Sequence, residues 1–427
     1  MTVKQVFNTS ADLDFPTVLP TLDLDFANSK TLDPRITFTR ASGGSYVGAD
    51  GLIKYAGVNE ARFDHDPATG ESLGLLIEGS STNLVVNSQI ISLGSGEGST
   101  FENNVGISPD GTNTMALITE NTSNGEHYHG DVALTPTLGS FYCWSAFVKA
   151  GPNLGVTKKI LFRIAAGNIA TALCTINGQF AGNVSFSPGS QGVSAGSQYY
   201  GNGIYRFWLV WRADSASTTV CRIQFWKNGV GSVYVGEENN FYLWGRQLEE
   251  GPFPTSYIPT TTSTRTRQPD QTQIVGKNFS DFYNLSEWTL TVATKRNYSG
   301  NFIFFPNLLR INDATSNNNI GFYGARGSIQ FTNFGVISGG INYTPYVAAN
   351  ISTTSPFKMV QALKKNMSTF GVNGILTPTA TSVEVPPRMT RMGIGWDFSG
   401  QYWGSPISRI SYYPKVLPNS QLISLTI

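Results

Sequence analysis

The sequence predicts an all-β protein in which an N-terminal extended or small β segment is followed by two β-sandwich (jelly-roll) domains in tandem. Three observations lead to this fold class. The chain of 427 residues contains 45 Gly, 26 Phe and 18 Tyr, a composition typical of short strands joined by many turns. Apolar residues alternate with polar ones at a period of two, with no helical period. The length suits two or three domains, and we place them at residues 1–85, 86–262 and 263–427.

The charge composition excludes several classes of partner. Charged residues make up 13% of the chain, and 29 Lys and Arg against 28 Asp and Glu leave a net charge of +1. A surface this neutral creates no strong field, so we expect neither nucleic acid nor a membrane as a partner. The sequence contains no run of about 18 apolar residues, so it predicts no membrane span. The first 20 residues lack the basic start and apolar core of a signal peptide.

The three cysteines, Cys143, Cys174 and Cys221, each lie inside an apolar, strand-like run. An odd number of cysteines without metal-type spacing gives no disulfide framework. We expect small buried thiols, which fits folding in a reducing cytoplasm.

In the N-terminal range, residues 22–26 (LDLDF) alternate apolar and acidic side chains and predict a strand with one buried face. The aspartates suit a solvated strand face, and metal binding is the alternative. His65 lies between Asp64 and Asp66 in a turn. A metal ligand or a catalytic acid is one interpretation of this histidine, and a turn residue that donates to a neighbouring carboxylate is the plainer one.

In the middle range, about eight apolar runs at short spacing predict the strands of a sandwich, with Asn177-Gly178 as a hairpin turn. The run at 241–248 predicts the last strand, because Gly251 and Pro252 break the pattern after it. The Thr- and Pro-rich stretch that follows predicts an extended strap leading into the next domain.

Two tryptophans of the middle range fall on partly polar strand faces. Trp208 shares a face with Arg206, and Trp226 shares one with Arg222 and Gln224. Because the flat apolar face of a pyranose packs on an aromatic ring, Trp208 and Trp226 are candidate carbohydrate-binding residues. An inter-subunit or inter-domain contact is the alternative.

Two histidines of the middle range, His127 and His129, stand two residues apart on a predicted strand. Two imidazoles at that spacing could share a metal ion. No third ligand is visible in the sequence, so a surface loop is the alternative.

In the C-terminal range, alternating runs and the hairpin signal Asn373-Gly374 predict the second sandwich. Asp397 lies in a Gly-rich loop close to Tyr402 and Trp403. These two aromatic residues are candidate carbohydrate-binding residues at the sheet rim. Asp397 could bind a sugar or a calcium ion there, and turn stabilisation is the alternative for this carboxylate. Calcium is the only cofactor that the sequence suggests, and no other metal is expected.

Catalytic motifs are missing from the sequence. Glycoside hydrolysis needs a pair of carboxylates, whereas Glu384 is isolated between two valines. There is no P-loop, dinucleotide fingerprint, zinc-protease helix or Gly-x-Ser-x-Gly elbow. We therefore expect that the protein is not an enzyme.

Several strings resemble segments of bacteriophage and prophage virion proteins. YLWGRQLEEG, TSYIPT and TRTRQPD occur in order over about 30 residues, as at the end of a carbohydrate-binding-type jelly roll in that family. TFTRAS, ADGLIK, ARFDHDP and ESLGLLIE resemble a segment near the start of phage structural proteins. By its position, this segment is expected to attach to the particle or to pack protomers. FKMVQALKKNMSTFGVNG and residues 393–426 are similar to a concanavalin-A-like, laminin-G-type jelly roll.

The resemblance implies a bacteriophage virion structural protein of the fibre, appendage or capsid-decoration type. It would contribute to host-surface or glycan binding. Two alternatives stay open: a purely structural decoration or connector protein without a ligand, and a polysaccharide-degrading tail component. The implied partners are other virion proteins, further copies of the chain (a homo-oligomer, a trimer being one option) and a host cell-surface glycan. The implied location is the virion, assembled in the host cytoplasm.

Overall fold

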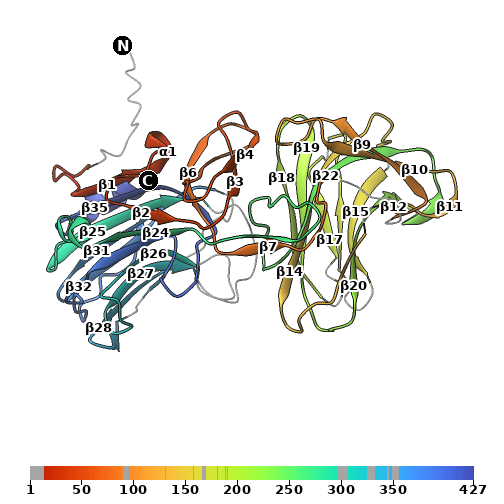
Figure 1. Ribbon diagram of the computed structural model, residues 1–427. Helices are drawn as coiled ribbons and strands as arrows, with labels where there is room; N and C mark the ends of the chain where they lie inside the picture. Colours follow the sequence, from red (N-terminus) through yellow and green to blue (C-terminus); the bar gives the residue numbers. More distant parts are fainter. Residues whose placement is uncertain are drawn as a thin grey trace, which may run out of the picture.

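The structure is a computed structural model. It describes residues 14–89, 96–129, 131–156, 158–165, 170–179, 181–187, 189, 191–295, 306–324, 332–343, 346–348 and 355–427. In this part of the chain two β-sandwiches lie beside each other (Figure 1), and every strand pair between named strands is antiparallel. The prediction of an all-β protein with two sandwiches is confirmed.

The middle sandwich consists of two sheets, called here the β14 sheet and the β20 sheet. The described strands of the β14 sheet are, in order, β18 (Gly192–Tyr199), β19 (Ile204–Arg212), β14 (Phe141–Ala150), β22 (Asn240–Glu250), β10 (Met115–Glu120) and β9 (Ser99–Gly106). Those of the β20 sheet are β17 (Val184–Ser187), β16 (Ala170–Cys174), β15 (Lys158–Ala165), β20 (Thr219–Lys227), β12 (Tyr128–His129) and β8 (Gly96–Glu97), with β13 (Val132–Leu134) also on β20.

The core of the middle sandwich follows from the two-residue period of its strands. Alternate residues of β19, including Phe207 and Leu209, and alternate residues of β20, including Ile223 and Phe225, are fully buried in one cluster between the sheets. Cys174 and Cys221 lie in this core, and all three cysteines are buried and free, as predicted. Burial raises the pKa of their thiols well above its ordinary value, so these side chains behave as small apolar residues.

The second sandwich also consists of two sheets, called here the β35 sheet and the β26 sheet. The described strands of the β35 sheet are β33 (Ile375–Leu376), β32 (Met367–Val372), β31 (Phe357–Lys364), β25 (Glu287–Thr294), β35 (Ser405–Tyr413), β6 (Ser72–Ile77) and β5 (Phe63–His65), with β1 (Leu22–Asp25) also on β35. Those of the β26 sheet are β2 (Thr37–Thr39), β24 (Gln271–Val275), β34 (Arg391–Ile394), β26 (Asn307–Asn312), β27 (Asn319–Gly324), β28 (Thr332–Ser338) and β29 (Ile341–Asn342), with β30 (Tyr346–Ala348) also on β28.

Strands from the N-terminal range are built into both sheets of the second sandwich (Figure 1). β1 pairs with β35 with Leu22 opposite Tyr412, so the predicted strand at 22–26 buries Leu22 and Leu24 in the shared core. β6 pairs with the start of β35, and a side chain at Gly74 (φ 97°) would overlap the Ile407 carbonyl oxygen. β1, β2, β5 and β6 of the N-terminal range thus complete this sandwich. The three-part division at residues 85 and 262 stays a prediction.

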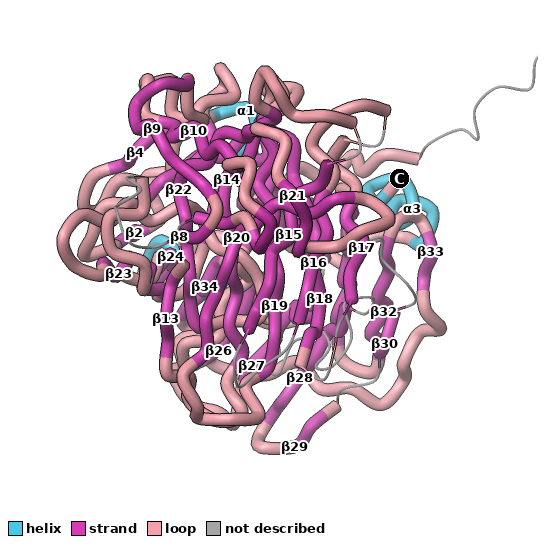
Figure 2. The backbone as a smooth tube through the Cα atoms, turned by 90° about the vertical axis from the view of Figure 1, so that its right-hand side faces the viewer, coloured by secondary structure: helices cyan, strands magenta, loops and turns pink. Residues whose placement is uncertain are grey.

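Three short two-stranded ladders are the remaining β structure of the described residues. β3 (Gly44–Val47) pairs with β4 (Ile53–Ala56), β7 (Ser81–Asn83) pairs with β23 (Arg265–Arg267), and β11 (Asn124–Glu126) pairs with β21 (Val233–Val235). The predicted strap, residues 251–264, runs from the end of β22 to β23 without helix or strand. The β14 sheet faces the second sandwich and the β20 sheet faces away from it (Figure 1). Figure 2 views the molecule from that outer end, where β15, β16 and β20 run side by side.

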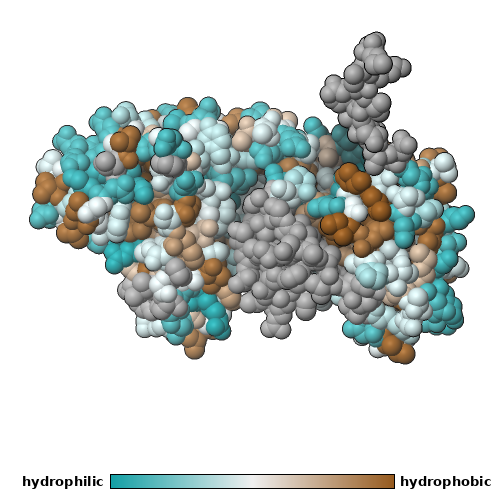
Figure 3. All heavy atoms as spheres, turned by 180° about the vertical axis from the view of Figure 1, so that it is seen from behind, coloured by the Kyte–Doolittle hydropathy of each residue, from teal (hydrophilic) through white to brown (hydrophobic). Residues whose placement is uncertain are grey.

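Helices are few and short. The described residues form α1 (Phe26–Ser29), α2 (Lys277–Ser280) and α3 (Asn419–Thr426). In this part of the chain, no helix has the length and apolar character needed to cross a membrane. On the face seen in Figure 3, hydrophilic residues predominate and hydrophobic ones gather in small groups.

Candidate functional site

Five charged side chains form a buried ionic cluster where the N-terminal strands, the strap and the second sandwich meet. They are Arg40, Arg62, Glu78, Arg267 and Asp270, each at most 4% exposed. Asp270 accepts from Arg40 at 3.0 Å and from Arg62 at 2.5 Å, and Arg62 also donates to Glu78 at 2.7 Å. Buried charges need such partners because leaving water is costly. Sequence reasoning missed this cluster, although its residues occupy the strings TFTRAS, ARFDHDP, GLLIE and TRTRQPD.

Two buried carboxyl groups, Glu78 of this cluster and Asp64, have pKa values shifted in opposite directions. Burial opposes ionisation of Glu78, yet the charges of Arg267 and Arg62 and hydrogen bonds from Ser256 hold its pKa at about 2. Burial raises the pKa of Asp64 to about 7, although the Val47 N–H donates to this carboxyl group at 2.7 Å. Glu78 is therefore ionised at neutral pH, while Asp64 is half protonated.

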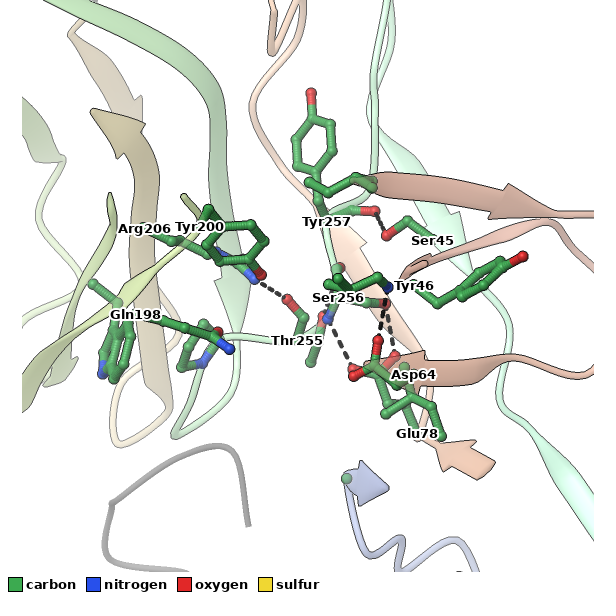
Figure 4. Close-up of a pocket in the computed structure, with 16 residues that line it drawn as sticks. Ser45, Tyr46, Asp64, Glu78, Gln198, Tyr200, Arg206, Thr255, Ser256 and Tyr257 are labelled. Carbon is green, nitrogen blue, oxygen red and sulfur yellow. Dashed lines mark hydrogen bonds between the residues drawn. The ribbon is translucent and has the colours of Figure 1, made fainter. Parts of the chain in front are cut away.

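Asp64 and Glu78 line a polar cavity between the two sandwiches (Figure 4). The strap residue Ser256 donates its N–H (2.8 Å) and its hydroxyl (2.7 Å) to Glu78. From the β14 sheet, Arg206 donates to the carbonyl oxygen of Thr255 at 2.7 Å. The cavity measures about 60 Å³, which holds water molecules but is far below the roughly 300 Å³ of a small-molecule site. This joint can fix the strap, but it has no space for a sugar ring.

Trp208 lies at this cavity and is 6% exposed. It packs with Cys143 and Val210 on the face of the β14 sheet that is turned towards the second sandwich. Its indole Nε1 is buried and has no hydrogen-bond partner among the described residues. The expectation of a sugar-stacking ring at Trp208 therefore does not fit, because this sheet is covered on both faces. Its place matches the alternative expectation of an inter-domain contact.

The rim of the second sandwich exposes one of its two predicted aromatic residues. Trp403 is fully buried and donates its Nε1–H to the Thr294 hydroxyl at 2.9 Å, so it is unavailable for stacking on a ligand. Tyr402 is half-buried, and its ring stacks on Trp396 with centroids 6.1 Å apart. Tyr402 also lines an open cleft of about 450 Å³ together with Phe253.

Asp397 acts as a turn residue in the structure. Its carboxylate accepts from the N–H groups of Ser399 and Gln401, both at 2.9 Å, and from the Ser399 hydroxyl at 2.5 Å. Among the described residues, no group of three or more His, Cys, Asp or Glu side chains is placed to hold a metal ion. The alternative of turn stabilisation accounts for Asp397, and the calcium expectation has no ligand set in this part of the chain.

The three histidines are buried and contact backbone or hydroxyl oxygens. His65 places Nδ1 3.0 Å from the Val47 carbonyl oxygen. His127 places Nδ1 2.7 Å from the Gly98 carbonyl oxygen and Nε2 3.0 Å from that of Tyr234, so both ring nitrogens are engaged. His129 lies 3.2 Å from the Ser99 hydroxyl. The surface-loop alternative for His127 and His129 is therefore wrong, since both are at most 5% exposed.

The outward face of the β20 sheet carries Trp226, which is half-buried and lies opposite Lys159. On the same face, the Arg222 guanidinium lies 3.5 Å from the centroid of the Tyr128 ring. Gln224 lies between these residues, opposite Tyr128, and is fully buried. Neither amide atom of Gln224 has a hydrogen-bond partner among the described residues.

Acidic residues hold this arginine in place. Arg222 donates to Asp131 at 2.9 Å and to Glu126 at 2.7 Å, and Glu126 also accepts from Arg163 at 3.0 Å. Such bidentate and shared contacts fix a guanidinium more firmly than a single exposed pair does. The outward face therefore combines a partly exposed indole with an ordered arginine–tyrosine stack.

Comparison with known proteins gives matches among solved structures alone. No family model matches the chain, and no curated protein matches it. Among solved structures, the chain is similar to the CBM40 domain of the Ruminococcus gnavus IT-sialidase bound to α2,3-sialyllactose, with 16% identity over 35% of this chain and 88% of that chain and a TM-score of 0.29. It is also similar to domain 4 of AbnA, a GH43 extracellular arabinanase from Geobacillus stearothermophilus, in complex with arabinotriose (12% identity, 41% and 82% covered, TM-score 0.32). A third match is domains LG4-5 of the mouse laminin α1 chain (10% identity, 79% and 94% covered, TM-score 0.23). TM-scores this low give no basis for transferring a ligand to this chain.

Proposed function

We propose that this protein is a structural component of a bacteriophage virion, of the fibre, appendage or capsid-decoration type, and that it binds host-surface glycans through the outward face of the β20 sheet. The virion assignment rests on the resemblance of its strings to phage structural proteins. It is supported by the neutral, aromatic-rich composition of the chain.

The observation that carries glycan binding is the half-buried indole of Trp226 on a polar, ordered sheet face. An indole offers a flat apolar surface for one face of a pyranose. The neighbouring Arg222 is already held by Asp131 and Glu126, so little side-chain freedom is lost when a ligand binds.

The test is binding to a glycan array and to host cells by the full chain and by two variants. Trp226→Ala removes the stacking surface and is expected to weaken binding at least about tenfold, which corresponds to about 1.4 kcal/mol. Tyr323→Ala is the matched control, because it truncates another half-buried aromatic residue, in β27 of the other sandwich, and should leave binding unchanged. If Trp226→Ala binds like the parent protein, the outward face of the β20 sheet is not the glycan site.

A connector protein without a ligand is the second candidate, and the buried ionic cluster favours it. Asp270 and Glu78 fasten the N-terminal strands to the strap, which gives a rigid unit suited to linking other proteins. Absence of binding to any glycan or host cell, with normal assembly into particles, would support this candidate. We also propose that the chain is a homo-oligomer in the virion, and sedimentation well above the 46.3 kDa of one chain is the expected result.

We propose no hydrolytic activity for this protein. Glu384 pairs with Lys365 at 3.3 Å, and Asp397 is committed to its own turn. Asp64 and Glu78, two buried carboxyl groups with shifted pKa values, face a cavity too small for a sugar ring. Release of reducing ends from host capsule or lipopolysaccharide would contradict this proposal.

A further inference from the structure

A second cleft lies next to the strap and shares Ser45 and Tyr257 with the polar cavity. This strap cleft is lined by Tyr55, Asp110, Tyr257, Ile258, Arg265 and Arg267, among others. Its elements are the β3–β4 hairpin, the turn before β10, the strap and β23. The volume of about 470 Å³ lies in the usual range for small-molecule sites. The cleft and the outward face of the β20 sheet have no residue in common.

The two arginines of the strap cleft come from one short strand. Arg265 and Arg267 are two residues apart in β23, so their side chains leave the same side of the strand. Both lie beside the side-chain-free backbone of Gly43 and Gly44. A Cβ at Gly43 would come within 3.8 Å of Arg265 Nη2, and one at Gly44 within 3.3 Å of Arg267 Cδ. The glycines thus keep open the space into which the guanidinium groups converge.

Arg267 retains hydrogen-bond donors that the protein does not use. Its Nη1 donates to the Gly79 carbonyl oxygen at 2.8 Å, but Nε and Nη2 are buried without a hydrogen-bond partner. The carboxylate nearest to it in an ion pair, that of Glu78, lies 3.6 Å away and is committed to Arg62 and Ser256. A buried guanidinium with unused donors is costly, and an acceptor placed beside these donors would lower that cost.

In the ionic cluster, the guanidinium groups outnumber the carboxylates that pair with them. Arg40, Arg62 and Arg267 are three guanidinium groups, and Glu78 and Asp270 are the two carboxylates that pair with them. Arg265 adds a fourth cation at the mouth of the cleft and is exposed. Burial lowers the pKa of Arg267, although the nearby carboxylates Glu78, Asp270 and Glu249 act in the opposite direction.

The opposite part of the strap cleft suits an uncharged ring. Tyr55 is 49% exposed there, and Ile258 adds apolar surface. The hydroxyl groups of Thr112 and Thr114 and the carboxylate of Asp110 lie in the same wall. An aromatic ring with neighbouring hydroxyl and carboxylate groups is the usual lining for a sugar.

We propose that the strap cleft binds an acidic sugar, with the carboxylate of a pyranose held by Arg267 and Arg265 and the sugar ring on Tyr55. Arg267 is the fixed partner because it is buried and oriented by Gly79 and the cluster. Arg265 contacts the carboxylate of the sugar from the side that faces solvent. This proposal does not depend on the glycan site at Trp226, and either can fail alone.

The test uses calorimetric titration of the full chain with two matched pairs of sugars, glucuronate against glucose and galacturonate against galactose. At least one uronate is expected to bind about tenfold more tightly or better than its neutral partner. Raising the salt concentration should weaken uronate binding and leave the neutral sugars unaffected. Equal affinities within both pairs, or no saturable uronate binding up to about 20 mM, would overturn the proposal.

Three variants locate the site. Arg265→Gln removes an exposed cation without touching the buried cluster and is expected to weaken uronate binding about tenfold. Lys277→Gln removes an equally exposed cation on α2 and should have no effect. Trp226→Ala should also leave uronate binding unchanged, which separates this cleft from the proposed glycan face. Uronate binding that is insensitive to Arg265→Gln would place the site elsewhere and refute the assignment.

Discussion

Replacing Asp270 by Asn tests whether the buried ionic cluster stabilises the second sandwich. The Asp270 carboxylate is fully buried and accepts from Arg40 (3.0 Å), from Arg62 (2.5 Å) and from the Glu78 N–H (2.8 Å). Asn has almost the same shape but carries no charge, and its amide nitrogen would face a guanidinium donor. Removing one partner of a buried ion pair costs about 3–5 kcal/mol, because the remaining charge stays out of water.

The assay is urea unfolding of the full chain followed by tryptophan fluorescence. Two sandwiches need not unfold in one step, and Trp288 and Trp403 in the second sandwich report on the affected transition. With a denaturant slope of about 2 kcal/mol/M, a loss of about 4 kcal/mol moves that midpoint by about 2 M. Asp281→Asn is the control, since it removes an exposed pair with Lys277 and should cost less than about 1 kcal/mol. If Asp270→Asn also costs less than about 1 kcal/mol, the cluster does not contribute as argued.

Two further predictions concern the polar cavity. Because the pKa of Asp64 is raised to about 7 in the folded state, the native protein binds more protons than the unfolded chain between pH 4 and 7, and its stability should fall by about 3 kcal/mol as the pH rises over that range. Unfolding measured at pH 5 and pH 8 should show this loss in the parent protein and not in Asp64→Asn. The pKa of Glu78 is about 2, so its contribution to stability should be lost only in more acidic solution, as the pH falls from about 4.5 to 2. Trp208→Ala should lower the free energy of unfolding by about 3–5 kcal/mol through the cavity it leaves, while the folded fraction keeps its glycan binding. Loss of binding without loss of stability would contradict the buried position of Trp208.

The strands were predictable from the sequence, but the burial of their outer faces by distant parts of the chain was not. Alternation in the run at 205–211 correctly divides Phe207 and Leu209 from Trp208. It does not reveal that both faces are buried, because the strap and the N-terminal hairpin that meet this sheet are far away in sequence. One signal was available: the nearly unbroken apolar run FWLVW is typical of a strand buried on both faces. Trp226 lies in a run with more charged and polar residues, and there the alternation gave the right exposure.

The other features that the sequence did not predict depend on contacts between residues far apart in the sequence. The pattern LDLD predicts a strand with one buried face, but nothing local identifies Tyr412 as the residue opposite Leu22. In the same way, the arginines at positions 40, 62 and 267 stand in recognisable strings, yet only the fold brings them to one carboxylate pair. Asp397 could be assigned to its turn from the Gly-rich loop alone, because its hydrogen-bond partners lie within four residues.

The pairing of β7 with β23 has a consequence for how this protein can be altered. The chain departs for the middle sandwich at Asn83 and returns at Arg265, and these two positions are direct neighbours across the ladder. The middle sandwich is thus an inserted domain whose two connections to the rest of the chain lie side by side. Exchange of the middle sandwich for another domain would need only new connections at two adjacent strands, so the second sandwich could stay unchanged while the inserted domain varies.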